Sequence, residues 1–470
     1  MKDGTAGWLA DVAHEFSGAE LPDVRLERRV TAVMSALAAK PDHSFPDAMG
    51  TDRALEGLYR LLNNPRVNHG PIFEAHALQT AERARNAGDV LILHDTSTFK
   101  LPHASVGEVG ETTTGAAGFF GHVSLVLDVQ AERCPLGVIA LNTIHRDPQR
   151  VRHDLSGPDC AKLDNKESAR WLQGVIQAEQ RLGQGVRAVH VMDREANSYA
   201  LYAALQLRGS RFVIRADDRK CLFEGEKTKV REALSRQPVV AEREVPLPRR
   251  KSRTTAPRSA RVEREARLAK LSITGCSVTL QRATYLRDPV PQQVVLNAVR
   301  VFETDPPPGQ APIEWFLLTN ESIETDELLL RVVDSYRCRW VIEEFFKALK
   351  TGCLYQEREL EDREALLIAL VLFLPIASQL LWLRSCSRSR PEASAEGLVN
   401  DVQMRVIRHF SSRKLPAAPT MRELVWAIAA IGGHIKNNGE PGWQVLGRAW
   451  QQILQLEHGW RAALLDSRQL

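Results

Sequence analysis

One stretch of the sequence, from Tyr336 to Lys350, combines two adjacent carboxylates with arginine, lysine and aromatic side chains. If this stretch is helical, each residue is turned by about 100° from the one before it. That spacing puts Glu343 on one narrow stripe with Tyr336, Arg339, Lys347 and Lys350. A carboxylate among bases suits metal-assisted phosphate chemistry, because the acid can hold a cation while the bases hold phosphate oxygens. The alternative is an ordinary surface helix, whose ion pairs contribute about 0.3–0.5 kcal/mol each.

The helix that presents this stripe is expected to begin near Asp326, where acidic residues suit a first turn, and to end at Gly352. Glu344 falls about 100° away from Glu343, so the spacing selects Glu343 as the acid that faces a site. The opposite side of the helix is apolar, as expected for a face packed on a core, and consists of Cys338, Val341, Ile342, Phe345, Ala348 and Leu349.

Two aspartates, Asp95 and Asp193, each close a short apolar run that has the composition of a β-strand. Between and after them, the pattern predicts a β-hairpin from 122–130 and 137–145, two helices and a further strand. This order is typical of a mixed sheet with crossover helices, and chemistry in open α/β sheets collects at the carboxyl ends of strands. A lone aspartate after a strand is more often a turn or cap residue, and that interpretation stays open for each.

Three domains are expected from the changes in pattern. Residues 1–68 form a small helical unit with a basic edge, which fits either a DNA-binding head or solvated helix faces. Residues 69–370 form an α/β catalytic domain with a β-rich insertion at about 218–320, and residues 371–470 are helical and rich in tryptophan. That last part is expected to join two subunits or to cap one core.

Composition excludes some classes of protein. The net charge of +4 is too small to indicate a polyanion partner by itself. Seven dispersed cysteines with no C-x-x-C pair argue against a disulfide framework or zinc ribbon and fit a reducing cytoplasm. The start of the chain lacks the apolar core of a signal peptide. The uncharged stretch at 365–383 is expected to be a buried core or dimer helix, not a membrane span.

A basic run lies inside the expected insertion. Residues 249–270 contain nine Arg and Lys residues and two Glu residues, with little apolar content. Such a run fits a solvated linker. It equally fits an arm that contacts phosphates, because a basic segment neutralises backbone phosphates and releases counterions. The sequence leaves both interpretations open.

The spacing Y-x2-R-x3-E-x6-K, filled by Tyr336, Arg339, Glu343 and Lys350, resembles the signature of bacterial cut-and-paste insertion-sequence transposases. The similarity covers nearly the whole chain. It includes the motifs LEGLYRLLNNP, HDTST, KESARWL, MDREA, EWFLLT and a carboxyl-terminal GGH…GW…W pattern, in this order.

The resemblance implies a ribonuclease-H-like sheet that brings together three acids, matched here by Asp95, Asp193 and Glu343. These three would hold two Mg²⁺ or Mn²⁺ ions, which suit phosphodiester displacement. By the same resemblance, a flipped base stacks on Trp315, although that residue also fits a core tryptophan in a strand. DNA contacts are implied, by the same likeness, for Tyr336, Arg339, Lys347, Lys350, Arg215, Lys40 and Arg60.

The implied activity is that of a DNA transposase. It would bind double-stranded transposon ends, cleave them through a hairpin and join the 3′ ends to target DNA. The implied assembly is a homodimer on the DNA, in the bacterial cytoplasm and nucleoid-associated when bound, with no membrane. Two alternatives remain. One is a structure-selective nuclease of the same fold, which would cut DNA without joining ends, and the other is a non-catalytic DNA-binding regulator.

Overall fold

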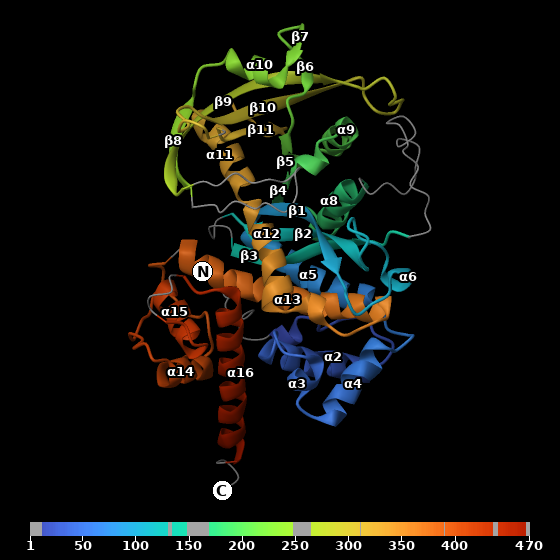
Figure 1. Cartoon of the computed structure of the whole chain (residues 1–470), viewed down its shortest axis with the longest axis vertical. Coiled ribbons are helices and arrows are strands. Elements are labelled where there is room, and N and C mark those ends of the chain that lie inside the picture. The colour runs from blue at the N-terminus through green and yellow to red at the C-terminus, as the bar shows by residue number, and fades with distance from the viewer. Residues whose placement is uncertain are drawn as a thin grey trace. The chain divides into compact units, whose positions relative to one another are not determined.

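The structure is a computed structural model of the whole chain, and it describes residues 12–129, 134–147, 169–247, 265–310, 312–389, 391–435 and 440–466 (Figure 1). Two compact units make up the chain. Unit 1 comprises residues 1–153, 173–188 and 340–470, and unit 2 comprises residues 154–172 and 189–339. The chain therefore leaves unit 1 and returns to it, so that each unit is assembled from distant parts of the sequence. The expected bounds of the three domains stay a prediction.

The amino-terminal part of unit 1 is a cluster of short helices. After the short turn η1 (Val12–His14), its helices are α2 (Val24–Ala39), α3 (Phe45–Met49) and α4 (Asp52–Leu62). Each of these three begins at a residue whose side chain accepts a hydrogen bond from the first turn, as an N-cap does: Asp23, Ser44 and Thr51. This part of the chain is thus helical, as expected.

Unit 1 also contains an antiparallel arrangement of three strands. Strand β1 (Asp89–Lys100) pairs with β2 (Gly118–Asp128), and β2 pairs with β3 (Cys134–Ile144), which confirms the predicted hairpin. Helix α5 (His69–Ala87) packs on β3, and side chains of α5, the three strands and α8 (Ala169–Leu182) form one buried cluster. The short helix α6 (Val106–Val109) lies between β1 and β2 in the sequence.

Unit 2 is organised around a larger run of strands. Strand β4 (Arg187–Met192), which begins just before the unit boundary, pairs in parallel with β5 (Arg211–Ala216). The strands that follow by antiparallel pairing are β11 (Glu314–Thr319), β10 (Gln293–Glu303), β9 (Arg267–Gln281), β6 (Lys220–Phe223) and β7 (Glu226–Lys229), while β8 (Ala241–Leu247) also pairs with β9. Parallel and antiparallel pairing in one sheet confirms the expected mixed α/β class.

Short helices lie between the strands of unit 2 or follow the last of them. They are η2 (Arg194–Ala196), α9 (Tyr199–Arg208), α10 (Val230–Ser235) and α11 (Asp326–Arg337). Helix α9 ends at Gly209, which adopts a left-handed conformation (φ 71°) that suits glycine. Most of the basic run at 249–270 lies outside the described residues. Only residues 265–270 of it are described, and Arg267 is the first residue of β9.

The apolar stretch at 365–383 forms most of α13 (Arg363–Ser389). By length and composition this helix could cross a membrane, since its mean hydropathy reaches 2.4. Its most apolar window is nevertheless entirely buried within the protein, and α13 packs against β3, α5 and α15. Burial on all sides is typical of a central core helix, which agrees with the expected buried helix. Pro375 lies inside it.

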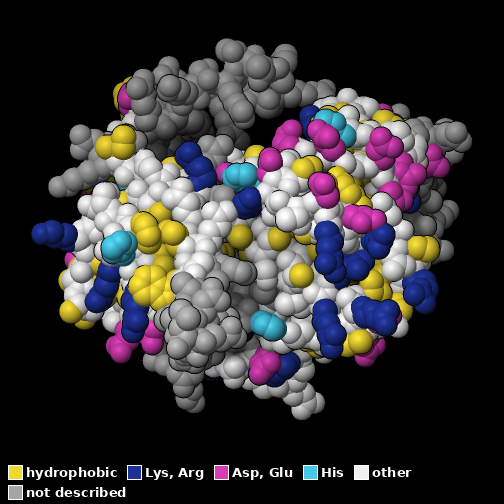
Figure 2. All heavy atoms as spheres, turned by 90° about the horizontal axis from the view of Figure 1, so that it is seen from below, with side chains coloured by type: hydrophobic (Ala, Val, Ile, Leu, Met, Phe, Trp, Pro, Cys, Tyr) yellow, Lys and Arg dark blue, Asp and Glu magenta, His cyan; other side chains and the backbone are white. Residues whose placement is uncertain are grey.

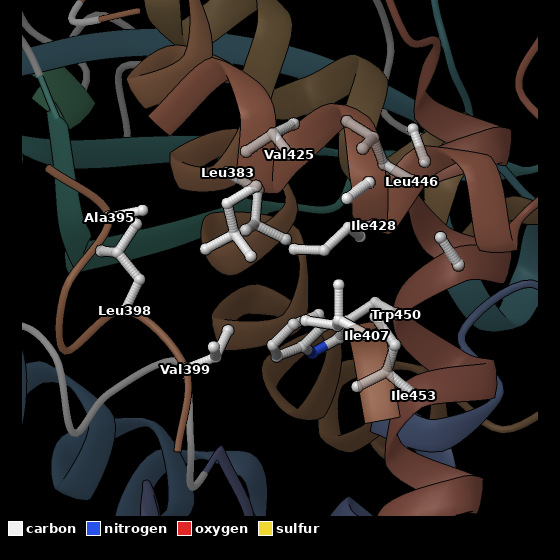
Figure 3. Close-up of a cluster of buried hydrophobic side chains, with 14 of the residues drawn as sticks. Leu383, Ala395, Leu398, Val399, Ile407, Val425, Ile428, Leu446, Trp450 and Ile453 are labelled. Carbon is white, nitrogen blue, oxygen red and sulfur yellow. The ribbon is translucent and has the colours of Figure 1, made fainter. Parts of the chain in front are cut away.

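The carboxyl-terminal helices of unit 1 share a core with the end of α13. They are α14 (Asp401–Phe410), α15 (Met421–Ile431) and α16 (Trp443–Asp466), in agreement with the helical character expected for this part of the chain. Figure 3 shows Ile407 of α14, Ile428 of α15 and Trp450 of α16 among the apolar side chains that fill this core. Ile407 and Ile428 are completely buried, and Trp450 is nearly so.

Candidate functional site

Asp95 lies within β1, opposite Val123 of β2. The expectation that it closes a strand is wrong, because pairing with β2 continues to Lys100. The residues from Asp95 to Thr98 are half-buried, whereas the five before them are buried. The backbone N–H of Thr96 donates a hydrogen bond of 2.8 Å to the Asp95 carboxylate. The strand therefore changes from core to surface at the aspartate and presents it there.

Glu343 belongs to α12 (Trp340–Lys347), a helix of unit 1 that packs on β1. Its side chain is half-buried and lies in the first turn. The neighbouring Glu344 forms an ion pair of 3.6 Å with Arg384 of α13. The structure thus places the elements that carry Asp95 and Glu343 against each other, and it turns Glu344 toward a different helix.

The single helix expected from Asp326 to Gly352 is interrupted. Helix α11 does begin at Asp326, but it ends at Arg337, and Cys338 and Arg339 form a turn before α12. In this turn the N–H of Arg339 bonds to the carbonyl three residues back, at a distance of 3.0 Å. Beyond α12, residues 348–352 form a π-helical turn, η3 (Ala348–Gly352), that ends at the expected glycine.

These two irregularities break the predicted stripe. A rotation of about 100° per residue holds only while each N–H bonds to the carbonyl four residues back. Tyr336 precedes the break and belongs to unit 2, whereas Glu343 and Lys347 follow it and belong to unit 1. Of the six residues on the helix face that was predicted to be buried, five are buried and Val341 is half-buried.

In unit 2, four of the predicted residues gather around a fifth, Tyr336, whose ring is buried with 5% of its surface exposed. Trp315 of β11 packs edge-to-face on it, with ring centroids 5.8 Å apart. Burial raises the pKa of the Tyr336 hydroxyl, and the charge of Asp193 raises it further. The positive charges of Arg339 and Arg215 lower the pKa of the Tyr336 hydroxyl. Arg215 lowers it also through a hydrogen bond to that hydroxyl. The phenol thus stays protonated and links an acid to two guanidinium groups.

Asp193 follows β4 directly, as predicted for an aspartate at a strand end. It is the N-cap of η2, and its carboxylate accepts a hydrogen bond of 2.8 Å from the N–H of Glu195. One of its oxygens thereby has a capping role, which is the ordinary interpretation of an aspartate here. The pKa of Tyr336 responds to the same carboxylate, so this acid also belongs to the Tyr336 group.

Two of the predicted DNA-contacting lysines, Lys350 and Lys347, belong to unit 1. The Lys350 ammonium donates a hydrogen bond of 2.7 Å to the Thr98 carbonyl and lies 5.2 Å from the centre of the Phe99 ring. Burial lowers the pKa of Lys350 to about 8, and the charge of Lys100 lowers it further. Lys347 is exposed, with its ammonium 5.5 Å from the centre of the Trp340 ring.

The two residues predicted in the amino-terminal helices have local partners. Lys40 ends α2 and donates a hydrogen bond of 2.6 Å to the carbonyl of Asp47 in α3, so it joins these helices. Arg60 is exposed on α4 and pairs with Glu56 one turn earlier, at 2.5 Å. Lys40 is half-buried, whereas Arg60 is exposed. The predicted DNA contacts of both residues stay a prediction.

The metal site remains a prediction. Among the residues that the structure describes, no three His, Cys, Asp or Glu side chains are grouped so that they could hold a metal ion. Asp95 and Glu343 belong to unit 1 and Asp193 to unit 2. The donor set itself fits the expected ion, because carboxylate oxygens are the ligands that Mg²⁺ and Mn²⁺ prefer.

Sequence reasoning did not identify the residues that contact Lys347, Glu344 and Lys350. Trp340, which lies beside Lys347, could have been found, since a spacing of seven residues puts both on one helix face. The partner of Glu344 is forty residues further along, and the carbonyl that holds Lys350 lies on β1. No local pattern connects such distant residues.

Two protein-family models match the chain. The model described as "Transposase DNA-binding" matches residues 7–67, and the model described as "Transposase DDE domain" matches residues 164–374. Asp193, Tyr336 and Glu343 lie within the second match, whereas Asp95 lies between the two. Two successive parts of the chain are therefore similar to a transposase DNA-binding domain and to a transposase DDE domain, which supports a relationship to insertion-sequence transposases.

Proposed function

We propose that this protein is a DNA transposase that binds transposon ends, cleaves them and joins their 3′ ends to target DNA. The observation that carries the proposal is the match to a transposase DDE domain over residues that include Asp193 and Glu343. The match to a transposase DNA-binding domain supports DNA as the partner, and we propose that this DNA is double-stranded. The motifs shared along the chain further resemble the transposase of a composite kanamycin-resistance transposon.

In this proposal Asp95, Asp193 and Glu343 are the acids that hold two Mg²⁺ or Mn²⁺ ions. When bound, such ions activate a water or 3′-hydroxyl nucleophile and stabilise the departing oxygen of the phosphodiester. The packing of α12 on β1 supports the pairing of Asp95 with Glu343. The resemblance supplies Asp193 as the third acid of the set.

The cationic and aromatic groups are proposed to hold the DNA end. Tyr336, Arg339 and Lys350 would grip the phosphate next to the cleaved bond, and Arg215 would position the Tyr336 hydroxyl. Trp315 would provide a stacking face for a base flipped out of the duplex, which is worth about 1–3 kcal/mol for a base on an aromatic ring. Its half-buried indole beside Tyr336 is consistent with that use. Lys347 and the residues Lys40 and Arg60 of the amino-terminal helices would contact DNA further from the cut.

The order of steps is proposed from the resemblance. The first strand is nicked, the freed 3′-hydroxyl attacks the opposite strand to form a hairpin, the hairpin opens, and the 3′ end is transferred into target DNA. Two copies of the chain would act together, each gripping one end and cutting the other, in the bacterial cytoplasm.

Incubation of the protein with Mg²⁺, end-bearing DNA and a target plasmid tests the proposal. We expect joined products, because a transposase transfers the freed 3′ end and does not stop at hydrolysis. Cleaved but unjoined ends would favour a structure-selective nuclease of the same fold. Binding of ends with no cleavage would favour a regulator. The reaction with Ca²⁺ in place of Mg²⁺ serves as the control for metal-supported catalysis.

Binding of end DNA is expected to weaken as pH rises from about 7 to about 9. Burial lowers the pKa of Lys350 to about 8, so its ammonium is charged below that pH and loses its proton above it. At a pH one unit above this pKa, protonating Lys350 so that it can bind a phosphate costs about 1.36 kcal/mol. This cost corresponds to a loss of about tenfold in affinity. The measurement is a titration of labelled end DNA at several pH values.

The matched variant for this effect is Lys350→Arg, whose guanidinium keeps its charge over the whole range. We expect the affinity of this variant to change much less between the two pH values. A decline of the same size in the wild-type protein and in the variant would assign the pH dependence to another group.

A further inference from the structure

Helix α14 and the segment after it present an unusual surface. Its polar side carries Arg405, Arg408 and His409, which are exposed at positions one helical turn apart, and it continues to Phe410 and Lys414. These five residues are called the α14 basic surface. No Asp or Glu occurs anywhere from residue 402 to residue 422. The surface lies outside both residue ranges that match transposase family models.

The cations of the α14 basic surface are not neutralised by the protein. Among the residues that the structure describes, neither Arg405, Arg408 nor Lys414 has an acidic side chain within ion-pair distance. Several exposed arginines elsewhere in the described part of the chain do have acidic partners, as Arg236 has Glu232 at 2.8 Å. An ordinary solvated face usually mixes both signs of charge, so an unmixed and unpaired cluster points to an anionic partner.

The helix dipole does not account for this cluster. Cations in the last turn of a helix are stabilised by its exposed carbonyl groups, and Arg408 and His409 are placed to benefit. Arg405 is more than one turn from the end of α14, and Lys414 lies beyond the helix. Two of the cations therefore gain little from the helix end, because the effect fades within the last turn.

The segment after α14 is held in place by specific contacts. The Ser411 hydroxyl donates a hydrogen bond of 2.9 Å to the carbonyl of Ala427 in α15. The Arg413 guanidinium stacks on Trp426 of α15, 4.5 Å from the ring centre. Arg408 also donates to the carbonyls of Pro416 and Ala417, the closer at 2.7 Å. These contacts fix the cations relative to one another at low entropic cost to a ligand.

An exposed aromatic side chain lies among these charges. Phe410 exposes 49% of its surface and packs edge-to-face against His409, with ring centroids 4.8 Å apart. Figure 2 shows one face of the molecule, on which Lys and Arg, Asp and Glu, His and hydrophobic side chains are all exposed. Positive charge with an adjacent aromatic ring is typical of surfaces that contact nucleic acid.

We propose that the α14 basic surface is a second DNA-binding surface, which holds the phosphate backbone of duplex DNA without reading its sequence. The proposal goes beyond the cleavage and joining of transposon ends, since it assigns the carboxyl-terminal helices a contact with DNA of any sequence. Separate cations contact phosphates as point charges, and no built pocket for a base is needed.

The test is the salt dependence of binding to a random-sequence duplex that lacks transposon ends. For each phosphate that a variant no longer neutralises, the slope of log K against log salt concentration falls in magnitude by about 0.9. We expect the variant Arg405→Gln/Arg408→Gln/Lys414→Gln to lower that slope by about 2 to 3 and to weaken binding equally for unrelated sequences.

The control removes the same amount of charge from paired arginines. Arg187, Arg236 and Arg422 each have an acidic partner, so the triple glutamine variant at these positions should leave the slope nearly unchanged. An equal fall in both triple variants, or no fall in the first, overturns the proposal. Should removal of the Arg408 bonds unfold the first variant, Arg405→Gln/Lys414→Gln keeps them and should lower the slope by about 2.

This experiment is independent of catalysis. The wild-type protein and each variant are also assayed for cleavage of end-bearing DNA with Mg²⁺. Absence of cleavage by the wild-type protein would contradict the proposed function and leave the salt slopes interpretable. An unchanged slope in the triple variant, together with normal cleavage, would contradict only the second DNA-binding surface.

Discussion

Glu343→Ala is expected to abolish cleavage of end-bearing DNA while leaving end binding largely intact. In the proposed mechanism Glu343 is one of three carboxylates that hold the divalent ions, and it contributes no positive charge to DNA binding. Removal of a single group that stabilises charge in a transition state commonly costs roughly 100-fold to 1,000-fold in rate, and a metal ligand should reach at least the upper value. Single-turnover cleavage with Mg²⁺, beside a binding titration on the same DNA, measures both effects.

The neighbouring Glu344 provides the matched control. Its carboxylate pairs with Arg384 at 3.6 Å, so we infer a structural role for it. Glu344→Ala should therefore retain cleavage within about tenfold, since a partly exposed ion pair contributes little. Asp95→Ala and Asp193→Ala should behave as Glu343→Ala does. If Glu344→Ala were inactive and Glu343→Ala active, the third acid would have been assigned to the wrong face of α12.

The sequence predicted those elements whose signal is local. Helices such as α2 and α15 follow the apolar periodicity of their residues and begin at capping side chains. The β2–β3 pair has the alternating or continuous apolar runs of a hairpin. The mixed sheet could likewise be inferred from the order of these runs. In each case the residues that determine the secondary structure of an element lie within that element or a few positions from it.

Two local predictions failed because tertiary pairing decided the outcome. After Asp95 the sequence continues Thr-Ser-Thr, residues that occur in turns as well as in strands. Pairing with β2 keeps them in β1. In the helix at 326–352, apolar periodicity gives no sign of the hydrogen bond to the third residue back at Arg339 or of the π-helical turn at 348–352. The types of the site residues were predictable, but their spatial stripe was not.

The interactions of Arg358 show most clearly what sequence patterns cannot reveal. This residue exposes only 4% of its surface, and its guanidinium donates hydrogen bonds to the carbonyls of Pro41, His43 and Cys353. The first two of these carbonyls are more than 300 positions earlier in the chain. The guanidinium also lies over the rings of Phe45 and Phe373, 5.1 and 4.6 Å from their centres. A single buried cation thus ties the amino-terminal helices to the segment that follows Lys350.

Arg358→Met is therefore expected to lower the free energy of unfolding by about 3 kcal/mol or more. The substitution keeps much of the side-chain volume but leaves three carbonyl groups without their donor, and an unsatisfied buried polar group costs about 1–3 kcal/mol. Urea denaturation followed by tryptophan fluorescence measures the change. Arg60→Met, which removes only an exposed pair with Glu56, should change the same quantity by less than about 0.5 kcal/mol. Equal stability of the two variants would mean that water replaces the Arg358 donors, and the proposed tie between the amino-terminal helices and the catalytic region would then be energetically unimportant.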